Sequence, residues 1–127
     1  MNIEAIEIGQ DDLQAVLEAL SEEQLHRLPF GVVRLDEAGK TVFYSETEGR
    51  QSGFGERRTL GRHFFTQIAP CMDTKAFNAR IEQARKAGFL DIRFAHVGDF
   101  EDEHREIDMR VMSSSDGGLW LCLQRGK

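Results

Sequence analysis

Residues 30–45 read FGVVRLDEAGKTVFYS, and this stretch decides the fold. Apolar and polar residues alternate on both sides of the tetrapeptide DEAG, whose glycine can adopt a positive φ in a tight turn. The pattern predicts a β-hairpin with strands over residues 30–36 and 40–45. Because side chains alternate along a strand, Val33 and Leu35 should face the same side of the sheet.

The chain before the hairpin is predicted to form two short helices within residues 10–27. Apolar residues at positions 13, 16, 17 and 20 recur with the spacing of one helix face. Asp11 or Asp12 is a candidate N-cap for the first helix. Ser21, which is followed by two glutamates, marks the start of the second helix.

The chain after the hairpin is irregular at first and then regains a clear pattern. Residues 46–63 contain four glycines, which predicts short helical turns and loop. The remaining elements are predicted in this order: a helix over residues 73–86 and strands over residues 90–97, 104–112 and 119–124. This order indicates an α+β domain with a five-stranded sheet, one face of which packs against helices.

The composition excludes several classes of function. With a net charge of −6 over 127 residues, the chain lacks the basic surface that nucleic-acid binding needs. No apolar run approaches the roughly 20 residues that span a bilayer, and the acidic N-terminus does not resemble a signal peptide. The two cysteines do not suggest a disulfide scaffold, and the four histidines lack metal-ligand spacing. We therefore expect a cytoplasmic protein that binds neither nucleic acid nor membrane.

Three polar residues form the first candidate site. Tyr44, Glu48 and Ser52 are spaced i, i+4, i+8, so on a helix over residues 44–52 they would share one side. A phenol, a carboxyl and a hydroxyl that converge can hold an anionic oxygen by short hydrogen bonds. Burial would raise the pKa of such a glutamate and keep it protonated as a donor. The same spacing is also typical of a partly exposed helix face.

A second candidate is Cys71, which follows Pro70 directly before the helix predicted over residues 73–86. A thiol near a helix N-terminus feels the positive end of the helix dipole, which lowers its pKa and raises its reactivity. The same position is also typical of a buried structural cysteine.

The stretch FFTQIAPCMD, residues 64–73, resembles the chromophore-attachment segment of the photoactive yellow protein family. Residues 28–49, LPFGVVRLDEAGKTVFYSETEG, resemble the first hairpin of that family and the turn that carries its active-site tyrosine and glutamate. In a gap-free alignment from Phe30 to Cys71, Tyr44 and Glu48 fall on the residues that bond the chromophore phenolate. Ser52 falls where the family has a threonine.

The resemblance implies a PAS-like fold, with a central five-stranded antiparallel sheet, helices packed on one face and short N-terminal helices. It implies a single domain over residues 1–127, comprising an N-terminal cap (1–28) and a PAS core (29–127). The implied function is that of a blue-light photoreceptor, not an enzyme, with p-coumaric acid attached as a thioester to Cys71. Signalling would then proceed by chromophore isomerisation, proton transfer from Glu48 and rearrangement of the N-terminal helices.

The sequence departs from the family pattern around the expected pocket. Phe54 stands where the family commonly has an arginine that closes the pocket. A cation that stabilises the chromophore phenolate would therefore have to come from elsewhere, with Arg50 and Arg57 as candidates. His96 aligns with a tyrosine near the chromophore, where it either tunes recovery with pH or serves as an ordinary strand histidine. The loop over residues 97–104 lacks the methionine that the family uses for recovery in the dark.

Two alternatives to a photoreceptor remain open. The first is a chromophore-free PAS module that binds a protein or a small ligand. The second is a redox sensor or enzyme that uses the Cys71 thiol, which would require a nearby base. In the photoreceptor interpretation we expect a monomer or weak dimer and an unidentified downstream signalling protein as the partner.

Overall fold

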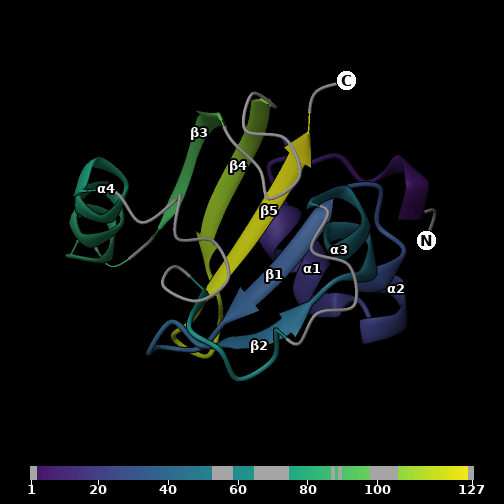
Figure 1. Ribbon diagram of the computed structural model, residues 1–127, viewed down its shortest axis with the longest axis horizontal. Coiled ribbons are helices and arrows are strands. Elements are labelled where there is room, and N and C mark those ends of the chain that lie inside the picture. The colour runs from purple at the N-terminus through teal and green to yellow at the C-terminus, as the bar shows by residue number, and fades with distance from the viewer. Residues whose placement is uncertain are drawn as a thin grey trace.

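The computed structural model describes residues 3–52, 59–64, 75–86, 88, 90–97 and 106–125. Within them the elements are, in chain order, η1 (Ile3–Ala5), α1 (Leu13–Ala19), α2 (Glu22–His26), β1 (Gly31–Leu35), β2 (Thr41–Tyr44), α3 (Glu46–Ser52), α4 (Lys75–Lys86), β3 (Asp91–Val97), β4 (Glu106–Ser113) and β5 (Leu119–Arg125). The strands form one antiparallel sheet of order β2-β1-β5-β4-β3 (Figure 1). The predicted five-stranded α+β fold is therefore confirmed.

The hairpin forms as the alternating pattern predicts. Strand β1 pairs with β2, and Val33 lies opposite Tyr44. The turn is closed by the N–H of Gly39, which donates to the carbonyl of Asp36 at 3.0 Å, and Gly39 has a φ of 86°. The Asp36 carboxylate also accepts the N–H groups of Ala38 and Lys40, both at 2.9 Å. A short polar side chain thus fixes the backbone of the turn.

Each face of the sheet carries its own apolar cluster. One cluster contains Val33 and Leu35, as predicted, together with Phe64 and with Ile81 of α4. The other cluster joins Val32 and Trp120 to apolar residues of α1 and α2. In Figure 1, α1 lies behind β1 and β5 and α2 lies to the right of β1, and the apolar residues of both helices cover the second face of the sheet.

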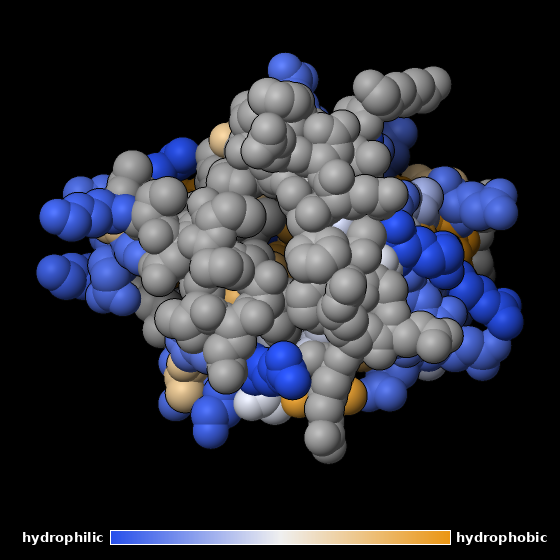
Figure 2. Space-filling view, in the orientation of Figure 1, coloured by the Kyte–Doolittle hydropathy of each residue, from blue (hydrophilic) through white to orange (hydrophobic). Residues whose placement is uncertain are grey.

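Most of the apolar side chains described are buried in these two clusters. Large exposed hydrophobic side chains are found at Val42 and Leu60. Figure 2 shows hydrophilic residues over the described surface at both ends of the molecule. No helix in the described ranges is both long and apolar enough to span a bilayer.

Helices α1 and α2 confirm the two short helices predicted within residues 10–27. Ser21 caps α2 in a capping box, because its hydroxyl accepts the Gln24 N–H while the Gln24 side chain accepts the Ser21 N–H. Asp12 occupies the N-cap of α1, but its side chain makes no capping bond. Its carboxylate instead accepts from the side chain of Gln10 at 2.8 Å.

A buried arginine ties the N-terminal segment to the sheet. Arg110 of β4 donates two bonds to the carboxylate of Asp91 on β3, at 2.9 and 2.8 Å. It also donates to the carbonyl oxygens of Ile8 and Gln10, at 3.0 and 2.6 Å. The hydrogen bond to Asp91 raises the pKa of Arg110, so this cation stays charged under all ordinary conditions.

Candidate functional site

The candidate site is built on α3, which starts directly after the edge strand β2. The Ser45 hydroxyl accepts the Glu48 N–H at 3.1 Å, so it caps the first turn of the helix. The same oxygen accepts the Val32 N–H at 3.0 Å and thereby fixes α3 against β1. Tyr44, Glu48 and Ser52 would share one side only if residues 44–52 formed one helix, and in the structure Tyr44 is the last residue of β2, within the strand predicted over residues 40–45.

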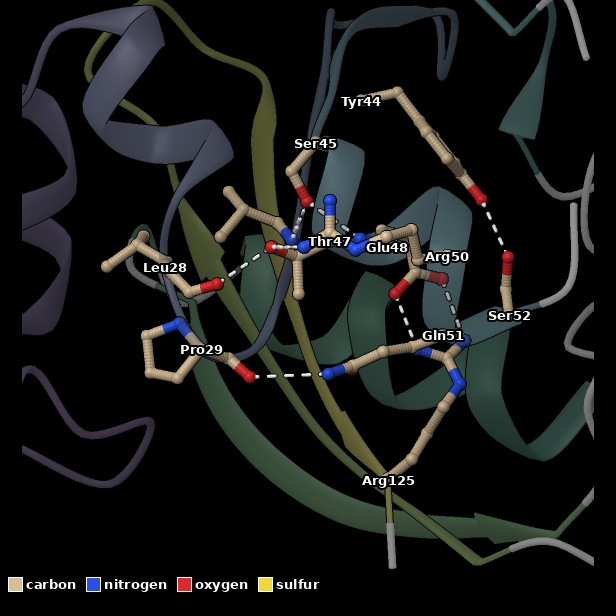
Figure 3. Close-up of polar contacts among 11 residues, drawn as sticks. Leu28, Pro29, Tyr44, Ser45, Thr47, Glu48, Arg50, Gln51, Ser52 and Arg125 are labelled. Carbon is tan, nitrogen blue, oxygen red and sulfur yellow. Dashed lines mark hydrogen bonds and ion pairs between the residues drawn. The ribbon is translucent and has the colours of Figure 1, made fainter. Parts of the chain in front are cut away.

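Tyr44 and Ser52 nevertheless come together. The Tyr44 hydroxyl and Ser52 Oγ are 3.4 Å apart, and either oxygen can be the donor (Figure 3). Ser52 is buried and the Tyr44 ring packs against the apolar cluster of Val33 and Leu35. A strand end and a helix end thus place a phenol and a hydroxyl side by side.

Glu48 lies in a buried ion pair. Its carboxylate accepts two bonds from Arg125, from Nη1 to Oε1 at 2.6 Å and from Nη2 to Oε2 at 2.8 Å (Figure 3). The side chains of Arg125 and Glu48 are 5% and 4% exposed. Two parallel bonds between a guanidinium and a carboxylate form the strongest arrangement of this kind. Glu48 was expected to be a protonated donor, but here both of its oxygens act as acceptors.

The Glu48 carboxylate occupies the space that a side chain at Gly31 would fill. A Cβ added to Gly31 would lie 2.0 Å from Oε1 of Glu48 and 3.0 Å from its Cδ. Gly31 pairs with Leu123 on β5, and Arg125 lies two residues further along that strand. Because side chains two residues apart share a face, Arg125 extends over the same side of the sheet as Leu123. The carboxylate therefore lies over the one position of this part of β1 that has no side chain, and it is within hydrogen-bonding distance of Arg125 at the end of β5.

Arg125 is not among the site residues predicted from the sequence, although a signal for it was present. The prediction ended the last strand at residue 124, one residue before the arginine. Leu121, Leu123 and Arg125 share one strand face, so a charge stands at the end of an otherwise buried row. A charge that continues an apolar strand face requires a buried partner, and this rule points toward a carboxylate.

Helix α3 is also bonded to the segment that follows α2. The Thr47 hydroxyl reaches the carbonyl oxygens of Leu28 and His26, at 2.8 and 3.0 Å. The Gln51 side chain donates to the carbonyl of Pro29 at 3.4 Å, and Nδ1 of His26 accepts the N–H of Glu46 at 3.0 Å. Helix α3 therefore carries Glu48 and Ser52 of the site and also holds the end of the N-terminal cap.

Several predicted site residues lie outside what the structure describes. Cys71, Phe54 and Arg57 fall outside the described residues. His96 is placed on β3 opposite Ile107, but its side chain lies outside the description. Arg50, a candidate for cationic help, donates to the Thr47 hydroxyl at 3.3 Å.

The second cysteine does not belong to the site. Cys122 is fully buried on β5, and burial raises the pKa of its thiol to about 12. A thiol in that state is not a nucleophile near neutral pH. In the part of the chain that the structure covers, no group of His, Cys, Asp and Glu could hold a metal ion.

Comparison with known proteins identifies the fold and the family. Residues 12–125 match the PAS fold family. The chain is 30% identical over 124 residues to the photoactive yellow protein of Rhodothalassium salexigens, covering 97% of this chain and 99% of that one. The chain belongs to the photoactive yellow protein family. The photoactive yellow protein of Halochromatium salexigens is 28% identical over 126 residues, which cover 98% of this chain and 99% of that protein.

A solved structure supports the same placement. The photoactive yellow protein domain of the sensor histidine kinase Ppr from Rhodospirillum centenum superposes with a TM-score of 0.77 at 29% identity. The match covers 87% of this chain and 98% of that domain. Fold and family together support a photosensor of the photoactive yellow protein type.

Proposed function

We propose that this protein is a light sensor that carries p-coumaric acid as a thioester on Cys71. The observation that carries the proposal is a polar set positioned by β2 and α3, in which half-buried Tyr44 meets buried Ser52, with buried Glu48 on the same helix as Ser52. A phenol and a hydroxyl 3.4 Å apart suit the hydroxyl end of a hydroxycinnamoyl group. A chromophore-free role requires none of these groups to converge.

The bound group would supply a double bond that light isomerises, and the chain supplies the surroundings. Tyr44 and Ser52 would bond the hydroxyl end of the group, and Glu48 would bond it from the adjacent turn of α3. Phe54 would close the mouth of the pocket with an apolar side chain, and His96 would tune dark recovery with pH. The family resemblance implies that the bound group is a phenolate, which absorbs blue light. The Glu48–Arg125 pair affects this absorption, because it influences whether the phenol is ionised.

The signal would leave the site through α3. The hydroxyl of Thr47 bonds the backbone at Leu28, so a shift of Glu48 moves the attachment point of the N-terminal cap. The proposed output is a rearrangement of residues 1–28 that a downstream protein recognises. We further propose a non-enzymatic, cytoplasmic protein that acts as a monomer or weak dimer.

A chromophore-free PAS module is the second candidate function. It is favoured by one observation, which is that Glu48 already holds a cation on both oxygens. A carboxylate satisfied in this way does not depend on a ligand for its hydrogen bonds.

The two functions are separated by reconstitution with activated p-coumaric acid. We expect an absorption band that bleaches under illumination and recovers in darkness. Cys71→Ala should abolish the band, and Cys122→Ala, which removes the buried thiol of β5, should leave it unchanged. If no adduct forms, or if an adduct forms without a photocycle, the chromophore-free module is the correct account.

A further inference from the structure

The ion pair of Glu48 and Arg125 decides where a proton can reside in this site. Arg125 donates to both carboxylate oxygens, and both side chains are removed from water. Guanidinium groups do not lose their proton in proteins, so the charge of Arg125 is fixed. A protonated Glu48 would have to turn an O–H toward that cation and give up one of the two bonds.

We infer that Arg125 keeps Glu48 ionised in the chromophore-free protein and that the site therefore takes a hydroxyaryl group in its neutral, phenol form. Glu48 would accept the O–H of the ligand instead of donating a proton to it. The part of this inference that concerns a bound chromophore rests on the function proposed above. The part that concerns Glu48 and Arg125 does not.

The count of buried charges supports this assignment. Arg125 and Glu48 cancel one another, so the pair brings no net charge into the interior. Among the described residues, an added phenolate would leave one negative charge without compensation as long as Glu48 stays ionised, and an uncompensated buried ion is unfavourable. The ordinary pKa of a phenol is about 10 and that of glutamate is about 4.3, so the proton resides on the phenol unless the carboxylate is destabilised. The guanidinium has the opposite effect, because it stabilises the carboxylate.

The other polar groups described around Glu48 have partners elsewhere. On its own helix, Arg50 donates to the Thr47 hydroxyl, and Tyr44 on β2 shares a bond with Ser52. Strand β1 presents a glycine at the point of contact, at Gly31. Strand β5 contributes Arg125, which lies opposite the apolar Ile107 of β4. The charge that faces Glu48 from the packed strands is therefore the guanidinium.

The first test uses the chromophore-free protein. Glutamate labelled with ¹³C at the side-chain carboxyl reports the protonation of Glu48 by NMR, with the signal assigned by its loss in Glu48→Gln. We expect a carboxylate at neutral pH in the unmodified protein. Arg125→Gln should raise the pH at which Glu48 takes up its proton by about 1–3 units, the usual effect of an opposite charge at this distance. Arg27→Gln, which breaks an exposed arginine–glutamate pair, should leave the Glu48 titration unchanged.

Arg125→Lys keeps the test decisive if Arg125→Gln does not fold. Lysine retains the charge but cannot make two parallel bonds, so Glu48 should protonate at a pH above that of the unmodified protein and below that of Arg125→Gln. A Glu48 signal that is protonated at neutral pH in the unmodified protein overturns the inference. The same holds if neither Arg125 variant shifts the titration.

The second test uses the protein reconstituted with p-coumaric acid. A neutral phenol absorbs at shorter wavelength than a phenolate, so the unmodified protein should absorb in the near ultraviolet. Arg125→Gln should move the band toward blue, and Arg125→Lys should not. A blue band of equal position in all three proteins overturns the inference about the ligand. Failure to form any adduct refutes the proposed function instead, and the NMR titration then still decides the state of Glu48.

Discussion

Gly31→Ala is the substitution whose effect follows most directly from the geometry of the site. The new methyl group would lie 2.0 Å from Oε1 of Glu48, a separation that no non-bonded pair of atoms can hold. The φ of Gly31 is not positive, so alanine is compatible with the backbone and the clash falls on the side chain of Glu48. The carboxylate must move, and one or both bonds from Arg125 must break.

The expected loss is large for a change of one methyl group. Breaking a buried ion pair while a charge stays buried destabilises by about 3–5 kcal/mol. Replacement of glycine by alanine stabilises by about 0.4–1 kcal/mol through the unfolded chain. The net effect should therefore be a loss of about 2–4 kcal/mol in the free energy of unfolding, measured by urea denaturation at neutral pH. Gly9→Ala is the matched control, because the nearest atom there is Nη1 at the free-moving end of exposed Arg93, at 3.1 Å.

A double-mutant cycle distinguishes this explanation from a general intolerance of β1. In a Glu48→Ala background the carboxylate is absent, and the remaining close approach is the Cβ of residue 48 at 3.0 Å. Gly31→Ala should then destabilise by less than about 1 kcal/mol, so the two substitutions should show strong coupling. An equal loss in both backgrounds would refute the reasoning. A loss below about 0.5 kcal/mol in the unmodified background would refute it as well.

Three further predictions concern the N-terminal cap and the cysteines. Arg110→Met should remove the bonds to the N-terminal backbone and destabilise by about 3 kcal/mol, with faster proteolysis of the first residues than in the unmodified protein. Burial favours a raised pKa for Glu18, but hydrogen bonds from Ser115 and Trp120 outweigh it and hold the pKa below the ordinary value of a glutamate side chain. Ionised Glu18 thus stabilises the fold above that value, and this contribution is lost as the pH falls through the lowered pKa, so Glu18→Gln should flatten the acid side of the stability profile followed by Trp120 fluorescence. A thiol reagent at neutral pH should modify Cys71 and spare Cys122 in the folded protein, and Cys122 should react after unfolding in urea.

The sequence predicts the sheet well because the relevant signals are local. The β1–β2 turn is specified by Asp36 and Gly39, which lie within four residues of each other. The start of α2 is specified by Ser21 and Gln24, three residues apart. Each signal acts within one turn or one strand, so no knowledge of the tertiary structure is needed.

The site was predicted only in part because its decisive contacts are distant in sequence. Tyr44 and Ser52 do meet, but through the end of a strand and the end of a helix, not along one helix. Glu48 and Arg125 are 77 residues apart, and their contact depends on the pairing of β1 with β5. The periodicity of the sequence predicts which face of a strand or helix each residue occupies. The order of the strands in the sheet decides which of these residues come into contact.

The position of Arg125 also constrains how a signal can leave the site. Strand β5 pairs with β1 up to Leu123 and with β4 up to Arg125, which lies opposite Ile107, so its end cannot move without breaking sheet bonds. Helix α3 has seven residues and is held by side-chain bonds, of which the Thr47 contacts to the backbone at His26 and Leu28 are among the shortest described apart from the Glu48–Arg125 pair itself. When Glu48 and Arg125 separate, α3 is therefore the partner that moves, and its bonds carry the movement to the N-terminal cap. Thr47→Val, which keeps the shape of the side chain and removes the hydroxyl, should leave the Glu48 titration intact. Hydrogen exchange in α1 and α2 should then no longer respond to Arg125→Gln, whereas an undiminished response would place the route elsewhere.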